Sequence, residues 1–161
     1  MRGAFVSKAA SLTVTAVLGL LGSNPIHAER RAPNPAAQVQ LAVDELKGRL
    51  TIPSEVTVLV VANNPLLVSV EADKDRHGTF VMSFEEDFLA QLDPTELRAV
   101  IAHELGHVWI FTHHPYLQTE RLANEVAMRV VSRQSLEKVY SKVWERGGAK
   151  GDLVQFLGGT Q

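Results

Sequence analysis

The stretch Ile101-Ala102-His103-Glu104-Leu105-Gly106-His107-Val108-Trp109 organises this sequence. If it is helical, His103 and His107 are four residues apart and lie on one face, one turn above the other. Two imidazoles placed in that way can bind one zinc ion. Glu104 projects from a neighbouring part of the same surface, where it can reach a water molecule beside the metal without being a ligand. The motif His-Glu-x-x-His therefore predicts a metal site, provided that the rest of the sequence supplies a helix and a further ligand.

The residues before the motif indicate where its helix begins. Asp93 is a typical N-cap, Pro94 suits the first helical position, and Glu96 occupies the capping-box position. Apolar residues then recur at helical spacing, at Leu97, Val100, Ile101, Leu105 and Val108. We therefore expect both histidines of the motif to lie on one helix with a well-marked start.

A catalytic zinc usually has three protein ligands and one open position. Glu120 is the preferred third ligand, because a helix that starts there can fold back onto the first helix. It would also put Glu120 and Asn124 on one face, one turn apart. Asn124 could then accept a hydrogen bond from the outward ring N–H of a ligand histidine. The alternative third ligands are Glu125, His113 and His114.

The motif and the segment after it together resemble a known family. His103-Glu104-x-x-His107 followed by Glu120-x-x-Ala123-Asn124 resembles the gluzincin zinc metallopeptidases. Within them it looks most like the CAAX prenyl endopeptidases, the membrane heat-shock proteases and their soluble periplasmic relatives. The resemblance covers roughly residues 55–130 and implies a small curled sheet beside a helical zinc site. The sequence departs from that pattern at Asn124, where the family carries aspartate.

These features predict a zinc-dependent endopeptidase with one Zn²⁺ per chain and a peptide or unfolded-protein substrate. Glu104 would act as the general base and would pass a proton to the leaving amine. The developing oxyanion needs a further donor. The candidates for that donor are His113, His114, Tyr116, Arg129 and Tyr140. The alternative function, motivated by Asn124 and the small size of the chain, is a weakly active or inactive zinc-binding module that binds periplasmic partners in the manner of a chaperone.

The periodicity of the remaining sequence predicts an α+β fold. About three short strands, antiparallel or mixed, would pack beside three to four helices, with the helix of the motif in the centre. We expect the second and third strands to pair as a hairpin, and Trp109 and Phe111 to pack in the core. The expected strands are 56–61, 67–71 and 79–84. The expected helices are 37–50, the helix that starts at 93, 118–132 and 134–146, with a short helical segment at 85–92.

The N-terminus has the pattern of a secretory signal peptide. Arg2 and Lys8 precede an apolar run, Ala9–Leu21, that is too short for a comfortable transmembrane helix. A helix-breaking segment and Ala28 then mark a cleavage site. We expect residues 1–28 to be removed and the mature protein to be secreted or periplasmic; in the alternative, the segment stays uncleaved and provides the chain's contact with a membrane.

Composition narrows the function classes further. The chain has 161 residues, a net charge of −2 and no cysteine, which excludes disulfides and thiol chemistry and gives no indication of nucleic acid binding. Nothing in the sequence indicates an oligomeric state.

Residues 29–146 are expected to form the zincin-like domain, and residues 147–161 a glycine-rich tail with a possible apolar docking patch at Leu153, Val154, Phe156 and Leu157.

Overall fold

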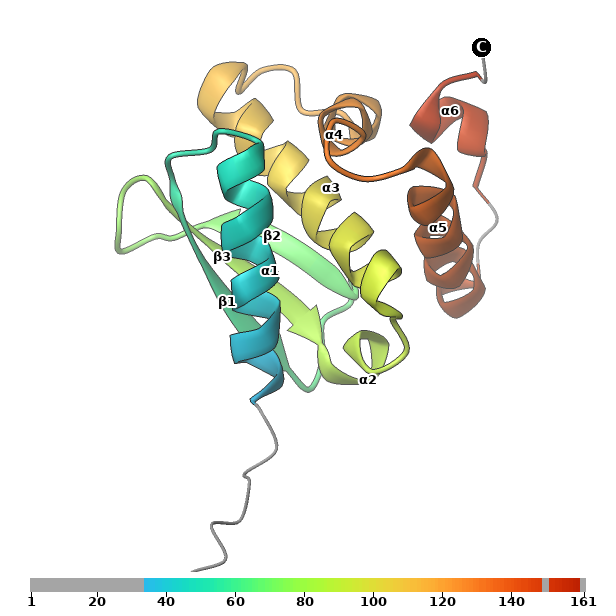
Figure 1. Cartoon of the computed structure of the whole chain (residues 1–161), viewed down its shortest axis with the longest axis horizontal. Helices are drawn as coiled ribbons and strands as arrows, with labels where there is room; N and C mark the ends of the chain where they lie inside the picture. The colour runs from blue at the N-terminus through green and yellow to red at the C-terminus, as the bar shows by residue number, and fades with distance from the viewer. Residues whose placement is uncertain (1–33, 149–150, 160–161) are drawn as a thin grey trace, which may run out of the picture. The chain divides into compact units, whose positions relative to one another are not determined.

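The computed structural model describes residues 34–148 and 151–159 (Figure 1). The expected signal peptide, residues 1–28, lies outside the described residues. The strands are β1 (Glu55–Val61), β2 (Val68–Ala72) and β3 (Thr79–Glu85). The helices are α1 (Pro35–Arg49), α2 (Glu86–Leu89), α3 (Pro94–His113), α4 (Glu120–Ala127), α5 (Arg133–Gly147) and α6 (Leu153–Leu157). The predicted α+β class is therefore confirmed, with more helices in the described residues than expected because α2 and α6 are single short turns.

The three strands form one mixed sheet in the order β1-β3-β2. β2 and β3 pair antiparallel, with Val68 opposite Phe84, so the predicted hairpin is confirmed. β1 pairs parallel with β3, with Glu55 opposite Thr79. β3 is thus the central strand, and its buried Met82 and Phe84 project into the core. Within the part of the chain that the structure describes, β2 has no further strand beside it, so one of its edges is open.

Helix α3 lies in the middle of the molecule (Figure 1). It packs against α1 and β2 on one side and against α4 and α5 on the other, while α6 contacts α4 and α5. The core is built from apolar side chains of α1, the sheet, α2 and α3 that are fully buried, among them Val43, Leu46, Phe84, Phe88, Ile101 and Leu105. In the described residues, no helix is both long enough and apolar enough to cross a lipid bilayer.

The start of α3 is the one that the sequence predicts. The Asp93 side chain accepts hydrogen bonds from the backbone N–H groups of Thr95 and Glu96, and the Glu96 carboxylate accepts one from the N–H of Asp93. This capping box satisfies donors that the helix itself leaves free. Lys142 of α5 also contacts the Glu96 carboxylate, so the capped end of α3 fixes the position of α5.

One expectation about the C-terminal half was wrong. The helix expected over 118–132 is shorter, because Thr119 caps α4, the chain turns after Met128, and Ser132 then caps a new helix, α5. The apolar patch expected in the glycine-rich tail packs onto the domain: it forms α6, and Leu157 is 3% exposed. The Leu157 carbonyl accepts a hydrogen bond from Arg133 of α5 at 2.9 Å, which holds the short helix in place.

Helices α3 and α4 approach closely at Gly106. A Cβ atom placed on Gly106 would lie 2.9 Å from the Cα and carbonyl carbon of Ala123, and closer still to the Ala123 carbonyl oxygen. Any side chain at this position would therefore push the two helices apart. The glycine inside the motif sets the distance between the helix that carries the histidines and the helix that carries Glu120 and Asn124.

Candidate metal centre and cleft

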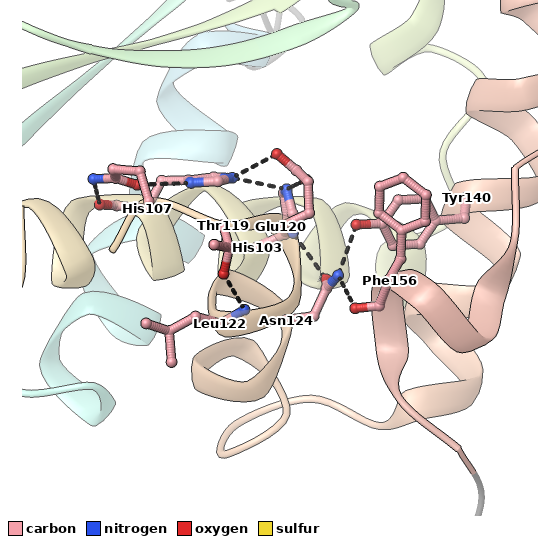
Figure 2. Close-up of polar contacts among 9 residues, drawn as sticks. His103, His107, Thr119, Glu120, Leu122, Asn124, Tyr140 and Phe156 are labelled. Carbon is pink, nitrogen blue, oxygen red and sulfur yellow. Dashed lines mark hydrogen bonds and ion pairs between the residues drawn. The ribbon is translucent and has the colours of Figure 1, made fainter. Parts of the chain in front are cut away.

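His103 and His107 face the same side of α3, and Glu120, the first residue of α4, lies opposite them (Figure 2). The two histidine Nε2 atoms are 3.3 Å apart. The Glu120 carboxylate oxygens lie 3.2 Å from Nε2 of His103 and 3.5 Å from Nε2 of His107. The three side chains each offer one ligand atom within 4.8 Å of the others, so together they could hold a metal ion.

The spacing of these atoms fits a small divalent metal. For ligand atoms at about 2.0–2.1 Å from a tetrahedral ion, the distance between two ligand atoms is roughly 3.3 Å. The two Nε2 atoms, 3.3 Å apart, match that value, while Oε2 of Glu120 lies 3.2 Å from Nε2 of His103 and its other oxygen, Oε1, lies 3.5 Å from Nε2 of His107. Nitrogen and carboxylate oxygen are also the atoms that zinc and similar metals accept.

Both histidines are oriented by a partner on the far side of the ring. Nδ1 of His103 is 2.9 Å from Oδ1 of Asn124, and Nδ1 of His107 is 3.2 Å from Oε1 of Gln118. A ring nitrogen that faces an amide oxygen must carry the hydrogen, because the oxygen can only accept. In the neutral rings, the lone pairs therefore sit on the Nε2 atoms that face Glu120, which is the tautomer a metal requires.

Glu104 is the buried acid of the site and is only 8% exposed. Burial raises the pKa of its carboxyl group, an effect that His103 and His107 partly offset. In Glu120, by contrast, hydrogen bonds that the two histidines donate when their rings are protonated hold the pKa well below its usual range. The two carboxyl groups thus have different environments. Glu104 is desolvated and binds a proton more readily, whereas Glu120 is held as an anion beside the histidines.

A cleft opens beside these residues. A cavity of about 390 Å³ is lined by His103, Glu104, His107 and Glu120 together with mostly apolar side chains, namely Leu66, Leu67, Val68, Ser69, Val70, Phe88, Val100, Leu136, Val139, Tyr140 and Val143. A second cavity of about 300 Å³ shares His107 and is lined by Val70, Ala72, Phe80, Val108, Phe111 and Gln118. Apolar surface therefore flanks the cluster on two sides.

The open edge of β2 borders both cavities. The backbones of Leu67 and Asp73 hydrogen-bond to β3, so the intervening residues alternate in direction. By this alternation the N–H and C=O groups of Val68, Val70 and Ala72 face away from β3, toward the open edge. The Val70 backbone also lies near enough to Glu104 to favour its charged form.

Of the five predicted oxyanion donors, Tyr140 lines the cleft. Its hydroxyl accepts a hydrogen bond from Asn124 at 2.7 Å, and burial raises its pKa, so the hydroxyl keeps its own proton to donate. His113 instead stacks on Trp109, whose ring also lies under the Arg129 guanidinium. His114 and Tyr116 lie in the exposed residues after α3, and Tyr116 is 97% exposed. None of these four lines either of the two cavities described.

The alternative ligands also lie apart from the cluster. Glu125 is exposed on α4 and pairs with Arg121 at 3.0 Å. Nδ1 of His113 donates to the Trp109 carbonyl oxygen at 2.9 Å, and His113 is not part of the three-residue cluster. The residues that the structure brings together are the preferred set of His103, His107 and Glu120, with Asn124 behind them.

Sequence reasoning missed three contributions to the site. Gln118, which orients His107, sits in an irregular segment where no spacing rule applies. The carbonyl of Phe156, which accepts a hydrogen bond from Asn124, is a backbone atom and leaves no signal in the sequence. Phe111 was expected in the core, but it is 49% exposed and lines the second cavity. Phe111 lies near the end of α3, one turn beyond His107, and this spacing could have predicted that it lies beside the site.

A helix bearing two histidines, a carboxylate on the next helix and a sheet edge beside the cleft define the chain as a zincin-type metallopeptidase. The sequence profile of Peptidase family M48 matches residues 36–159, which is most of the chain, and the chain belongs to that family.

One solved structure adds evidence about the fold. It is the crystal structure of the metallopeptidase zymogen of Pyrococcus abyssi abylysin, with a TM-score of 0.51. The likeness covers 71% of this chain and 99% of that chain, at 14% sequence identity, and therefore concerns the fold alone. Among curated protein sequences, no match is found.

Proposed function

We propose that this metallopeptidase is a zinc-dependent endopeptidase in which His103, His107 and Glu120 bind the metal and Glu104 is the general base. The observation that carries the proposal is the convergence of two imidazole Nε2 atoms, 3.3 Å apart, and the Glu120 carboxylate beside a buried carboxyl group. Membership of family M48 supports the reaction class. Two nitrogens and one oxygen from the protein, with a further position left for water, are typical of catalytic zinc, and we expect one ion per chain.

The roles of the side chains follow from their environments. Bound zinc would polarise the scissile carbonyl and lower the pKa of a water molecule at its open position. Glu104 accepts the proton of that water as the oxygen adds to the carbonyl carbon, and it then delivers the proton to the amine when the C–N bond breaks. The raised pKa that burial gives Glu104 makes it a better proton acceptor than an exposed glutamate.

Tyr140 is the proposed donor to the oxyanion. It lines the same cavity as Glu104, and its oxygen already accepts a hydrogen bond from Asn124, so the hydroxyl hydrogen points away from Asn124, toward Glu120 and the cleft. A neutral donor held in place before the reaction stabilises developing negative charge without reorganisation. Replacing Tyr140 by phenylalanine is expected to lower kcat by about 10²-fold.

The proposed substrate is an extended peptide segment with apolar side chains. The open edge of β2 offers the carbonyl groups of Val68 and Val70 and both backbone groups of Ala72, to which an extended chain can add as a further strand. Side chains on either side of the scissile bond would then reach the two cavities, whose walls are mostly apolar. An unfolded protein supplies such segments, whereas a folded one buries them.

The proposed compartment is the periplasm or the extracellular space. The basis is the pattern of residues 1–28, in which a basic start, an apolar run and Ala28 follow the order of a cleaved signal peptide. N-terminal sequencing of the exported protein should begin at Glu29. Recovery of the protein in the membrane fraction with Met1 intact would instead indicate that the segment serves as an anchor.

The deciding experiment compares Glu104→Gln with Glu125→Gln in a proteolysis assay on an unfolded casein-type substrate. Glutamine keeps the shape of residue 104 but cannot accept the proton, so we expect kcat to fall at least about 10²-fold while one zinc stays bound. The control removes a carboxylate that lies on the exposed side of α4, paired with Arg121, and should keep wild-type activity. Full activity of Glu104→Gln would exclude the mechanism, and zinc binding without turnover by the wild type would favour the non-catalytic module.

A further inference from the structure

The buried side chain of Asn124 connects the metal centre to the C-terminal helix α6 (Figure 2). Asn124 is 0% exposed. Its Oδ1 faces Nδ1 of His103 at 2.9 Å, and its Nδ2 donates to the Tyr140 hydroxyl at 2.7 Å and to the Phe156 carbonyl oxygen at 3.0 Å. The amide therefore has a partner for its oxygen and for both of its hydrogens.

We propose that α6 is a positioning element of the metal centre: the Phe156 carbonyl fixes the orientation of the Asn124 amide, and the amide fixes the metal-binding tautomer of His103. The inference rests on the proposed function only in taking His103 as a metal ligand. Phe156 acts through its backbone, and Asn124 acts through His103, so neither residue has to touch the substrate.

The Phe156 carbonyl is the partner that decides which way the amide points. A carbonyl oxygen can only accept, so it requires the NH₂ end of Asn124. A tyrosine hydroxyl can donate or accept, so Tyr140 is compatible with both orientations. With the amide reversed, Oδ1 would face the Phe156 oxygen at about the present donor–acceptor distance, and two acceptors buried together are unfavourable.

The orientation of the amide determines where His103 carries its hydrogen. With Oδ1 toward the ring, Nδ1 of neutral His103 must donate, and the lone pair lies on Nε2, facing His107 and Glu120. With the amide reversed, its NH₂ group would donate to Nδ1, and the hydrogen would move to Nε2. That tautomer has no lone pair toward the metal and cannot bind it.

A carboxylate at residue 124 would not have this dependence. Both of its oxygens accept, so it selects the Nδ1–H form of His103 in either orientation. The amide selects that form only while a second acceptor holds its NH₂ end. In this chain, the choice of asparagine therefore makes the metal centre depend on the segment that supplies the Phe156 carbonyl.

Helix α6 is held where this carbonyl is needed. Leu157 is buried, and the Arg133 guanidinium of α5 donates to the carbonyls of Leu157 and Gly158 at 2.9 and 2.7 Å. The Phe156 ring packs near Tyr140, with ring centroids 5.3 Å apart. These contacts fix α6 through residues that are not metal ligands, so α6 can be loosened without altering the cluster itself.

The test measures zinc affinity of the full chain, by competition with a chromophoric chelator, after α6 is loosened in two backgrounds. Leu157→Ala in the Asn124 background is expected to lower zinc affinity about tenfold or more, the usual effect of losing support behind a ligand histidine. In the Asn124→Asp background, the same substitution should lower it less than about threefold, since a carboxylate needs no second acceptor. Equal losses in both backgrounds, or no loss in the Asn124 background, would overturn the proposal.

Two further variants keep the test decisive if Leu157→Ala folds poorly. Arg133→Gln removes the guanidinium that donates to the end of α6, and residue 133 is partly exposed. Zinc affinity should again fall more with Asn124 than with Asn124→Asp, but by less than for Leu157→Ala. Val154→Ala changes an α6 side chain that is 61% exposed and should leave zinc affinity unchanged. If Arg133→Gln and Val154→Ala behave alike in both backgrounds, the proposal is wrong.

The tautomer can also be observed directly. In metal-free Glu120→Ala protein at alkaline pH, where no carboxylate faces Nε2 of His103, histidine ¹⁵N chemical shifts should report the Nδ1–H form for His103, and adding Leu157→Ala should give a growing Nε2–H population. An unchanged tautomer would overturn the proposal. Neither readout requires turnover, so a chain that shows both effects but cleaves no peptide would refute the proposed endopeptidase and leave this inference standing.

Discussion

Replacing Gly106 by alanine should separate α3 from α4 and impair the metal centre. The new Cβ would lie 2.9 Å from two Ala123 backbone carbons, whereas ordinary contact begins at 3.4 Å, so the helices must move apart by at least about 0.5 Å. Backbone atoms cannot rotate out of the way as a side chain can. Metal ligands have to lie within about 0.2 Å of their ideal distances. We therefore expect zinc affinity to fall by at least about tenfold.

Gly106→Ala should also change the stability of the metal-free chain, but only modestly. Overpacking at a helix contact costs about 1–3 kcal/mol. Alanine gains about 1 kcal/mol over glycine inside a helix, which offsets part of that cost. The free energy of unfolding of the metal-free chain should thus fall by about 0–2 kcal/mol. Chelator competition measures the affinity, and denaturant unfolding without metal measures the stability.

Gly48→Ala is the matched control. Gly48 lies in the last turn of α1, and a Cβ there would meet nothing within 4 Å. This substitution should therefore raise stability by about 0.5–1 kcal/mol and leave zinc affinity unchanged. If Gly106→Ala binds zinc as tightly as the wild type, the close approach of α3 and α4 does not position Glu120 for metal binding.

Three further changes test other parts of the account. Gln118→Ala removes the partner of His107 Nδ1 and should lower zinc affinity by up to about tenfold in chelator competition, less than for a buried partner because Gln118 is exposed. Hydrogen bonds from the backbone of Glu96 lower the pKa of Asp93, so its stabilisation of α3 is present above the ordinary aspartate pKa of about 3.9 and is lost as the pH falls below it. Asp93→Ala should accordingly lower the melting temperature at pH 7, and the difference from the wild type should narrow in melting scans below about pH 4; a constant difference would contradict the capping role. Val143→Phe narrows the larger cavity and should raise KM for substrates with bulky apolar residues about tenfold without changing zinc affinity, and an unchanged KM would show that this cavity does not receive the substrate.

The parts of the fold that were predictable are those that depend on neighbouring residues. Asp93, Pro94 and Glu96 mark the start of α3 because a capping box is a local arrangement. The hairpin of β2 and β3 followed from a short connection that contains glycine, and Gly78 has a positive φ of 79° there. Because His103 and His107 are four residues apart on a helix, the sequence alone predicted that both rings lie on the same side of it.

The parts that were not predictable depend on contacts between distant residues or on backbone atoms. The parallel pairing of β1 with β3 joins strands separated by the hairpin, and no local pattern specifies it. The end of α4 at Ala127 was missed because apolar spacing continues through residues 128–131, while the chain turns there. The Phe156 carbonyl of α6 contacts His103 of α3 through Asn124 of α4. No sequence pattern indicates this chain of contacts, because the three residues meet only in the folded structure.

One zinc ion, held by His103, His107 and Glu120, is proposed to make this chain a peptidase. The most direct test is a zinc titration of the metal-stripped protein, with hydrolysis of an unfolded casein-type substrate measured at each step. Activity should rise linearly from zero and stop rising at one zinc per chain. Full activity before zinc is added, or activity that rises without a break at one equivalent, would contradict the claim.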